Sequence, residues 1–129
     1  MVLNMSENYY PEKFDVYIGG YMGTSYKVQW DGGHLEYVVF GQGYEPLKTT
    51  AIAADEAKWK TFWAAIDRII AWDWKDDYTK QGVMDGTSWG VEIVLNGRQL
   101  ESGGSNAYPP KFTGFLKAVQ QLLGGEEFA

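Results

Sequence analysis

The chain has 129 residues, of which 17 are acidic and 11 are basic, and its formal net charge is −6. This length suffices for one ordinary hydrophobic core, so we expect a single domain over residues 1–129. The negative charge disfavours nucleic acid and anionic membranes as partners, because both repel an acidic protein. Cysteine is absent and there is one histidine, which argues against disulfides, a thiol nucleophile, a metal site or a metal cofactor.

Aromatic residues make up 16% of the chain, a fraction typical of a folded globular domain. The first residues, "MVLNMSENYYPEKF", lack the basic and apolar segments of a signal peptide. The chain also lacks the run of about 18 apolar residues that a membrane-spanning helix needs. We therefore expect a cytoplasmic protein.

Three strands are predicted in the first third of the chain. In "FDVYI" at 14–18, Phe14, Val16 and Ile18 alternate with polar residues, which indicates a half-buried strand. "GTSYKVQW" at 23–30 and "HLEYVVF" at 34–40 flank the turn residues "DGG", a pattern typical of a hairpin.

A helix is predicted next, because apolar residues recur at 3.6-residue spacing in the segment that follows. These residues are Trp59, Phe62, Trp63, Ile66, Ile69 and Ile70. The ten residues "LKTTAIAADE" before the helix carry no strand prediction. The segment after it, "AWDWKDDYTKQGVMDG" at 71–86, is predicted to be a packed loop.

A second hairpin and helix resemble the first. "GTSWGVEI" at 86–93 matches "GTSYKVQW", Asn96-Gly97 is a strong type I′ turn signal, and "RQLES" follows as a strand. A second apolar stripe consists of Phe112, Phe115, Leu116, Val119, Leu122 and Leu123. We predict a ββα repeat with units at about 14–71 and 85–124; the alternative is that ordinary amphipathic elements look alike.

Together these elements predict a two-layer α+β fold. An antiparallel sheet of four or five strands would carry two helices on one face. The other face would be open, with an apolar centre at Val38, Phe40 and Val94. Such a patch suits docking of a partner protein or formation of a homodimer.

The stretch "SGGSNAYPPKF" at 102–112 is the best candidate for a site. It partly matches the G-x-S-x-G turn that exposes a nucleophilic serine, but the last glycine is missing and nothing brings His34 to Ser105. A structural interpretation explains the same residues. The glycines would end a strand, Asn106 would bond nearby backbone, and the prolines would occupy the first helical turn. No catalytic residue is assigned.

The six tryptophans are mostly expected to be structural. Trp30, Trp59, Trp63 and Trp89 lie on predicted core faces. Trp72 and Trp74 flank Asp73 near the end of a helix, where an exposed ring could stack on a sugar or peptide. The alternative for these two is packing beside the core.

Residues 72–123 resemble a family of uncharacterised bacterial proteins. The resemblance is carried by "AWDWKDDY", "DGTSWGVEI", "NGR" and "SGGSNAYPP", with Gly-Gly-Ser-Asn where Gly-Ser-Asn is expected. No activity is established for that family, so no catalytic residue is implied. Its recurrent positions here are Asp85, Gly86, Trp89, Gly104, Ser105, Asn106, Tyr108 and Pro109. From these we take Asp85, Trp89, Ser105, Asn106 and Tyr108 as candidate ligand-binding residues.

Two main functional classes remain, beside a third possibility, a purely structural or immunity-like acidic protein, which would show neither a ligand pocket nor a flat docking face. The first is a small acidic binding domain that engages a protein partner or a second copy of itself. The second is a small hydrolase or carbohydrate-active protein that uses the strand-end loops. An enzyme predicts a concave pocket holding a carboxylate of raised pKa, whereas a binding domain predicts a flat face.

Overall fold

The computed structural model describes residues 8–80 and 86–129, which form one seven-stranded sheet and two α-helices. The strands are β1 Lys13–Gly19, β2 Ser25–Trp30, β3 Leu35–Phe40, β4 Pro46–Ile52, β5 Asp77–Thr79, β6 Ser88–Leu95 and β7 Arg98–Ser105. The helices are α1 Glu56–Arg68 and α2 Phe112–Leu122, with short 3-10 turns η2 Gln42–Tyr44 and η3 Ala71–Asp73.

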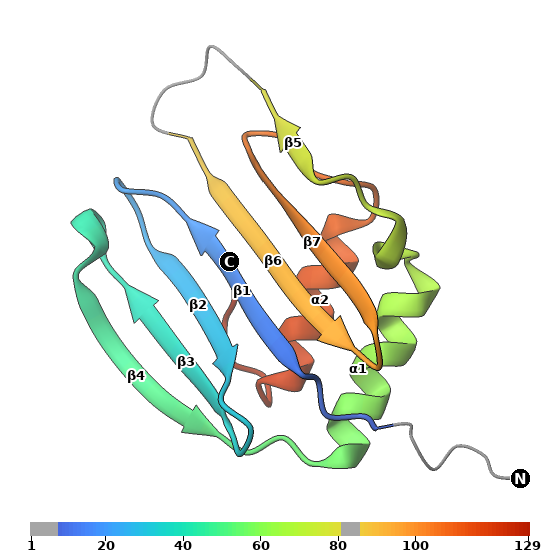
Figure 1. Ribbon diagram of the computed structural model, residues 1–129. Helices are drawn as coiled ribbons and strands as arrows, with labels where there is room; N and C mark the ends of the chain where they lie inside the picture. The colour runs from blue at the N-terminus through green and yellow to red at the C-terminus, as the bar shows by residue number, and fades with distance from the viewer. Residues whose placement is uncertain (1–7, 81–85) are drawn as a thin grey trace, which may run out of the picture.

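The sheet has the order β4-β3-β2-β1-β6-β7-β5, with β1 in its centre. Neighbouring strands are antiparallel except β5, which runs parallel to β7. Both helices lie behind the sheet in Figure 1, on the same face. The predicted α+β fold with helices on one face is therefore confirmed.

The prediction of four or five antiparallel strands was wrong, because two segments without a strand prediction, the seven-residue β4 and the three-residue β5, join the sheet. Residues 46–52 pair with β3 as an edge strand, although their side chains are mostly exposed and show no clear apolar alternation. Residues 77–79, expected in a loop, pair with the end of β7. β4 also separates the first hairpin from its helix, so the common origin of the two hairpin-helix units stays a prediction.

The core lies between the sheet and the helices and is rich in aromatic rings. On the sheet side, alternate residues of each strand are buried, including Phe14, Val16 and Ile18 of β1 as predicted. Trp59 of α1 lies at the centre, with its ring against those of Phe14 and Trp30. The C-terminal segment completes this layer, because Phe128 is fully buried against Tyr26.

The first helix is shorter than its apolar stripe indicated. Trp59, Phe62, Trp63 and Ile66 are buried, but α1 ends at Arg68. Ile69 is the C-cap, and Ile70 takes a left-handed conformation with its side chain 56% exposed. The tight connection to η3 thus overrides the last two apolar positions. In α2 the predicted stripe is buried except for the half-buried Leu116.

The hairpin turns follow their local sequence signals. Asn96 and Gly97 both have positive φ, as a type I′ turn requires. Asp31 closes the β2–β3 turn by accepting hydrogen bonds from the backbone N–H groups of Gly33 and His34, both at 2.8 Å. These bonds lower the pKa of the Asp31 carboxyl. Among the described helices, none has the length and apolar character to cross a membrane.

Replacing Trp59 by alanine is expected to lower the free energy of unfolding by about 4 kcal/mol, because it empties the centre of a fully packed core. Urea denaturation measures this change. The control is Leu47→Ala on β4, where the side chain is 61% exposed and the expected change is within about 0.5 kcal/mol. Equal losses in the two variants would contradict a core centred on Trp59.

We predict that ionisation of Tyr37 lowers the stability of the fold at alkaline pH. Burial, with smaller contributions from nearby Glu126 and Tyr26, raises its pKa from 10.0 to about 12. The pKa of Tyr37 is higher in the folded state than in the unfolded chain, so the protonated phenol stabilises the fold. This stabilisation is complete below pH 10 and is lost as the pH rises through about 12. Urea denaturation should show a steeper loss between about pH 10 and 12 in the wild type than in Tyr37→Phe. Identical pH profiles would contradict this assignment.

Candidate functional site

The stretch at 102–112 begins as regular strand, because β7 continues through Ser105. Its glycines permit close backbone approach. A Cβ on Gly104 would collide with the carbonyl of Tyr78 on β5, and one on Gly103 would lie 3.0 Å from the carbonyl oxygen of Trp89. The expectation that the glycines end the strand was wrong, since both lie within β7 and neither has a positive φ.

Asn106 is the first residue of the stretch to leave strand geometry, with a φ of 61°. Its backbone N–H donates to the Thr87 carbonyl at 2.9 Å, and its side-chain Oδ1 accepts from the Thr87 N–H at 3.1 Å. Gly86 packs directly under this side chain, where a Cβ would collide with it. Asn106 therefore fixes the start of β6 to the end of β7.

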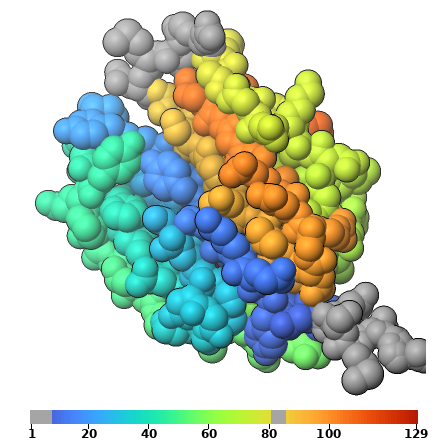
Figure 2. All heavy atoms as spheres, in the orientation of Figure 1, coloured from blue at the N-terminus to red at the C-terminus, as the bar shows by residue number. Residues whose placement is uncertain are grey.

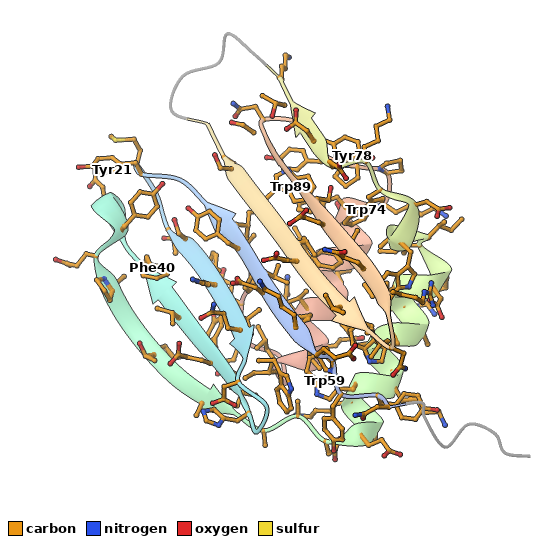
Figure 3. All side chains as sticks on the ribbon, in the orientation of Figure 1. Tyr21, Phe40, Trp59, Trp74, Tyr78 and Trp89 are labelled. Atoms are coloured by element: carbon orange, nitrogen blue, oxygen red, sulfur yellow. The ribbon has the colours of Figure 1, made fainter. Side chains whose placement is uncertain are left out.

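Trp89 anchors the loop that follows. Its side chain is 4% exposed and its indole N–H donates to the Ala107 carbonyl at 2.8 Å. The ring packs against Phe112 of α2, Trp74 and Tyr78. Figure 3 shows Trp89, Trp74 and Tyr78 near the end of the sheet where β5 lies.

The prolines precede α2 rather than starting it, which corrects the sequence-based expectation. The helix begins at Phe112, and its N-cap is Lys111 with a φ of 61° and no side-chain cap. Tyr108, 45% exposed, stacks on Phe112 with ring centroids 5.1 Å apart.

A pocket of about 590 Å³ lies where these loops meet the β1–β2 hairpin. We call it the strand-end pocket. Its apolar walls include Ile18, Met22, Tyr26, Phe112 and Leu116. Other lining residues carry polar groups: hydroxyls on Thr24, Thr87, Thr113 and Tyr108, and an amine on Lys111. Four glycines also line the pocket. No acidic or histidine side chain from the described residues lines it.

The candidate ligand-binding residues are therefore divided among different environments. Tyr108 lines the strand-end pocket, whereas Trp89 is buried beneath the loop. Ser105 and Asn106 contact each other, with Asn106 Nδ2 3.3 Å from Ser105 Oγ. Asp85 lies outside the described residues. The binding roles assigned to these residues stay predictions.

Ser105 and His34 lie at opposite ends of the sheet. Ser105 pairs with Ser88, whose other neighbour Gly19 precedes the β1–β2 hairpin. His34 is in the turn at the far end of β2, where its Nε2 lies 3.2 Å from an Asp31 oxygen. The two side chains therefore cannot form a nucleophile and general base pair.

The second candidate site is the sheet face that the helices leave uncovered, which we call the open face. Figure 2 views this face, where side chains of the strands form the surface. Val38 and Phe40 lie together on β3, but Val94 is on β6, with β2 and β1 between them. The structure thus separates one member of the predicted apolar centre from the other two.

Val38 instead adjoins a group of aromatic and apolar side chains at and beside the β1–β2 and β3–β4 connections. We define the aromatic patch as four aromatic residues and one leucine: Tyr17, Tyr21, Phe40, Tyr44 and Leu47. Tyr21, Tyr44 and Leu47 are exposed, and Tyr17 and Phe40 are partly buried. Tyr21 is 61% exposed and packs edge-on against Tyr44, with the ring centroids 5.8 Å apart. The Gly43 N–H donates to the Tyr21 carbonyl at 2.7 Å. Burial, followed by the nearby Tyr44, raises the pKa of Tyr17. Figure 3 shows Tyr21 and Phe40 on the same side of the sheet.

Carboxylates form a row across the open face, which also carries Lys13 and Lys27. Glu101 is directly opposite Glu92, which is directly opposite Asp15. The row continues through Gln29 to Glu36 on β3. We call Glu101, Glu92, Asp15 and Glu36 the acidic row.

One ion pair and one hydrogen bond from a neutral amide stabilise two carboxylates of the acidic row. Lys13 Nζ lies 2.9 Å from Glu92 Oε1, which raises the lysine pKa, and Gln29 Nε2 donates to Asp15 Oδ2 at 2.8 Å. No ion pair with Glu101, Asp15 or Glu36 is found among the described residues. Directly opposed like charges destabilise a sheet, so repulsion within the acidic row lowers the stability of the fold.

Trp72 and Trp74 do not form a free stacking surface. Trp74 is buried, and Trp72 is half-buried with its indole N–H donating to Asp67 Oδ1 at 2.9 Å. The guanidinium carbon of Arg98 lies 4.2 Å from the Trp72 ring centre. These contacts support the packing alternative for both residues.

Comparison of the sequence with models of known protein families gives no match. Comparison with curated protein sequences also gives none. The resemblance based on the Asp85–Pro109 pattern therefore stays a prediction, and the function must be argued from the two candidate sites.

Replacing Asn106 by alanine is expected to lower the free energy of unfolding by about 2 kcal/mol, from lost hydrogen bonding and the cost of a left-handed alanine. Asn106→Gly keeps the backbone freedom and should lose only about 1 kcal/mol. Urea denaturation of both variants separates the two causes. A fully stable Asn106→Gly variant would show that the side chain does not hold β6.

Proposed function

We propose that the protein is a binding domain that docks a protein partner with a basic surface on its open face. The observation that carries this proposal is the combination of the aromatic patch and the acidic row on one uncovered sheet face. Aromatic side chains are enriched at the centres of protein interfaces, and charged residues around them select a partner of opposite charge.

The exposed rings are positioned before any partner binds. Tyr21 and Tyr44 pack against each other, and the backbone hydrogen bond between Gly43 and Tyr21 connects the two loops that carry them. Tyrosine has few rotatable bonds, so an ordered tyrosine loses little entropy on binding. The patch is therefore suited to be the anchor of an interface.

The acidic row determines the sign of the partner. Glu101, Glu92 and Asp15 repel one another at directly opposed positions, and a cationic surface over them would relieve that repulsion. A second copy docking through the same face would add repulsion, because an isologous contact brings each row toward its copy. We therefore favour a basic partner over a homodimer.

The hydrolase alternative is met in only one respect, because a concave pocket lies at the strand-end loops but the described residues place no catalytic group in it. The strand-end pocket has no acidic or histidine side chain among its described lining residues, and Ser105 lies far from His34. Binding accounts for both surfaces without a missing catalytic group.

Glu101→Lys is expected to stabilise the fold and to weaken binding of the partner. A lysine opposite Glu92 replaces repulsion by attraction, worth about 0.5 kcal/mol in urea denaturation. The same change places a positive charge beneath a basic partner, which should weaken binding at least about tenfold. The control Asp73→Lys makes an equal change in net charge at an exposed position on η3 and should leave affinity within about twofold.

The partner can be obtained by photo-crosslinking in the native cell, with benzoylphenylalanine in place of Tyr21 or, as a control, of the exposed Thr61 on α1. A protein captured only from position 21 is purified, and its affinity is measured by calorimetry at low and high salt. Affinity that falls with salt and with Glu101→Lys supports the proposal. Equal loss in Glu101→Lys and Asp73→Lys, or capture of only a second copy of the chain, would overturn it.

A further inference from the structure

The strand-end pocket is a cavity on the core side of the sheet, separate from the open face. It lies between the core side of the sheet and the start of α2, because Ile18 and Tyr26 belong to the buried faces of β1 and β2. Its volume of about 590 Å³ is in the range of small-molecule pockets. This inference is independent of the docking proposal.

The pocket walls are closely packed against neighbouring segments. Gly19 packs against Ser25 so closely that any Cβ would collide with that side chain, and a Cβ on Gly20 would lie 2.8 Å from the Gly86 carbonyl oxygen. Ser25 Oγ also accepts a hydrogen bond from the Gly20 N–H at 3.1 Å. On the other side, Tyr108 stacks on Phe112. The cavity is therefore preformed, as ligand pockets usually are.

The chemistry of the lining defines the ligand class. Ile18, Met22, Tyr26, Phe112 and Leu116 offer an apolar surface to a hydrocarbon or aromatic body. Lys111 is the charged side chain among the described lining residues, and no ion pair to it is found within the described part of the chain. Ala129, the last residue of the sequence, also lines the pocket, and a free carboxylate there would keep a bound anion on the Lys111 side. A lysine beside an apolar cavity favours a ligand with one anionic group, through a charge-assisted hydrogen bond.

We propose that the strand-end pocket binds a small amphipathic anion, with its apolar body between the sheet and α2 and its anionic group at Lys111. The hydroxyls of Thr113 and Tyr108 supply further hydrogen-bonding groups among the same lining residues. The carboxylate of an aromatic or aliphatic acid fits this description.

The test is an NMR titration of the full chain with 4-phenylbutyrate and with its neutral amide, each up to about 10 mM, the range in which fragments of this size bind. We expect saturable shifts at Ile18, Tyr108 and Phe112 for the acid. The Lys111→Gln variant should bind the acid about tenfold more weakly, as loss of a charge-assisted hydrogen bond predicts, and the amide unchanged.

Two glycine variants provide a matched pair. Gly23 lines the pocket and Gly90 lies on the open face; at both, a Cβ meets nothing within 4 Å and φ is not in the left-handed region. Gly23→Leu should fill the pocket and weaken binding at least about tenfold, whereas Gly90→Leu should bind like the wild type. Equal binding by both variants, equal binding of acid and amide, or no shifts at the pocket would overturn the proposal.

Discussion

The indole of Trp89 is the contact on which this end of the molecule depends. It lies beneath the connection between β7 and α2, donates its N–H to the Ala107 carbonyl, and packs against Phe112 of the helix. One side chain thus fixes where the strand ends and where α2 begins. The position of Tyr108 and Lys111 at the strand-end pocket follows from that anchor, because both lie between Ala107 and the helix.

Close backbone packing adds a second constraint at the same place. Gly104 allows β5 to lie beside β7, and Gly86 leaves room for the Asn106 side chain. These glycines serve the packing of neighbouring segments rather than positive φ, which neither has. A glycine-rich stretch before a helix therefore need not be a ligand cradle. Here the glycines allow β5 to pack against β7 and the Asn106 side chain to pack against the start of β6.

The sequence was sufficient to predict the elements whose signals are local. Alternation located β1 and both hairpins, Asn96-Gly97 specified its turn, and apolar spacing located α1 and α2. It did not predict β5, because a three-residue parallel strand exists only through its partner β7. It did not predict β4 either, because an exposed edge strand has no buried face to impose alternation.

The candidate sites were harder to predict for the same reason. Strand order is a tertiary property, so nothing local could show that β1 and β2 separate Val94 from Phe40. Likewise, Tyr21 and Tyr44 come from different loops and meet only in the folded chain. The acidic row depends on register across four strands. Tyr108 was proposed from the family resemblance; it lines the strand-end pocket, but its binding role stays a prediction.

The two proposed sites share the β1–β2 hairpin. Tyr21 belongs to the aromatic patch, while the next two residues, Met22 and Gly23, line the strand-end pocket. A ligand that contacts Met22 and Gly23 would therefore lie directly beside the residue with which a partner on the open face makes contact. If either ligand shifts this hairpin, thermodynamic linkage requires that both binding affinities change by the same factor. The β1–β2 hairpin is therefore the element through which a ligand at one site would change the affinity of the other site.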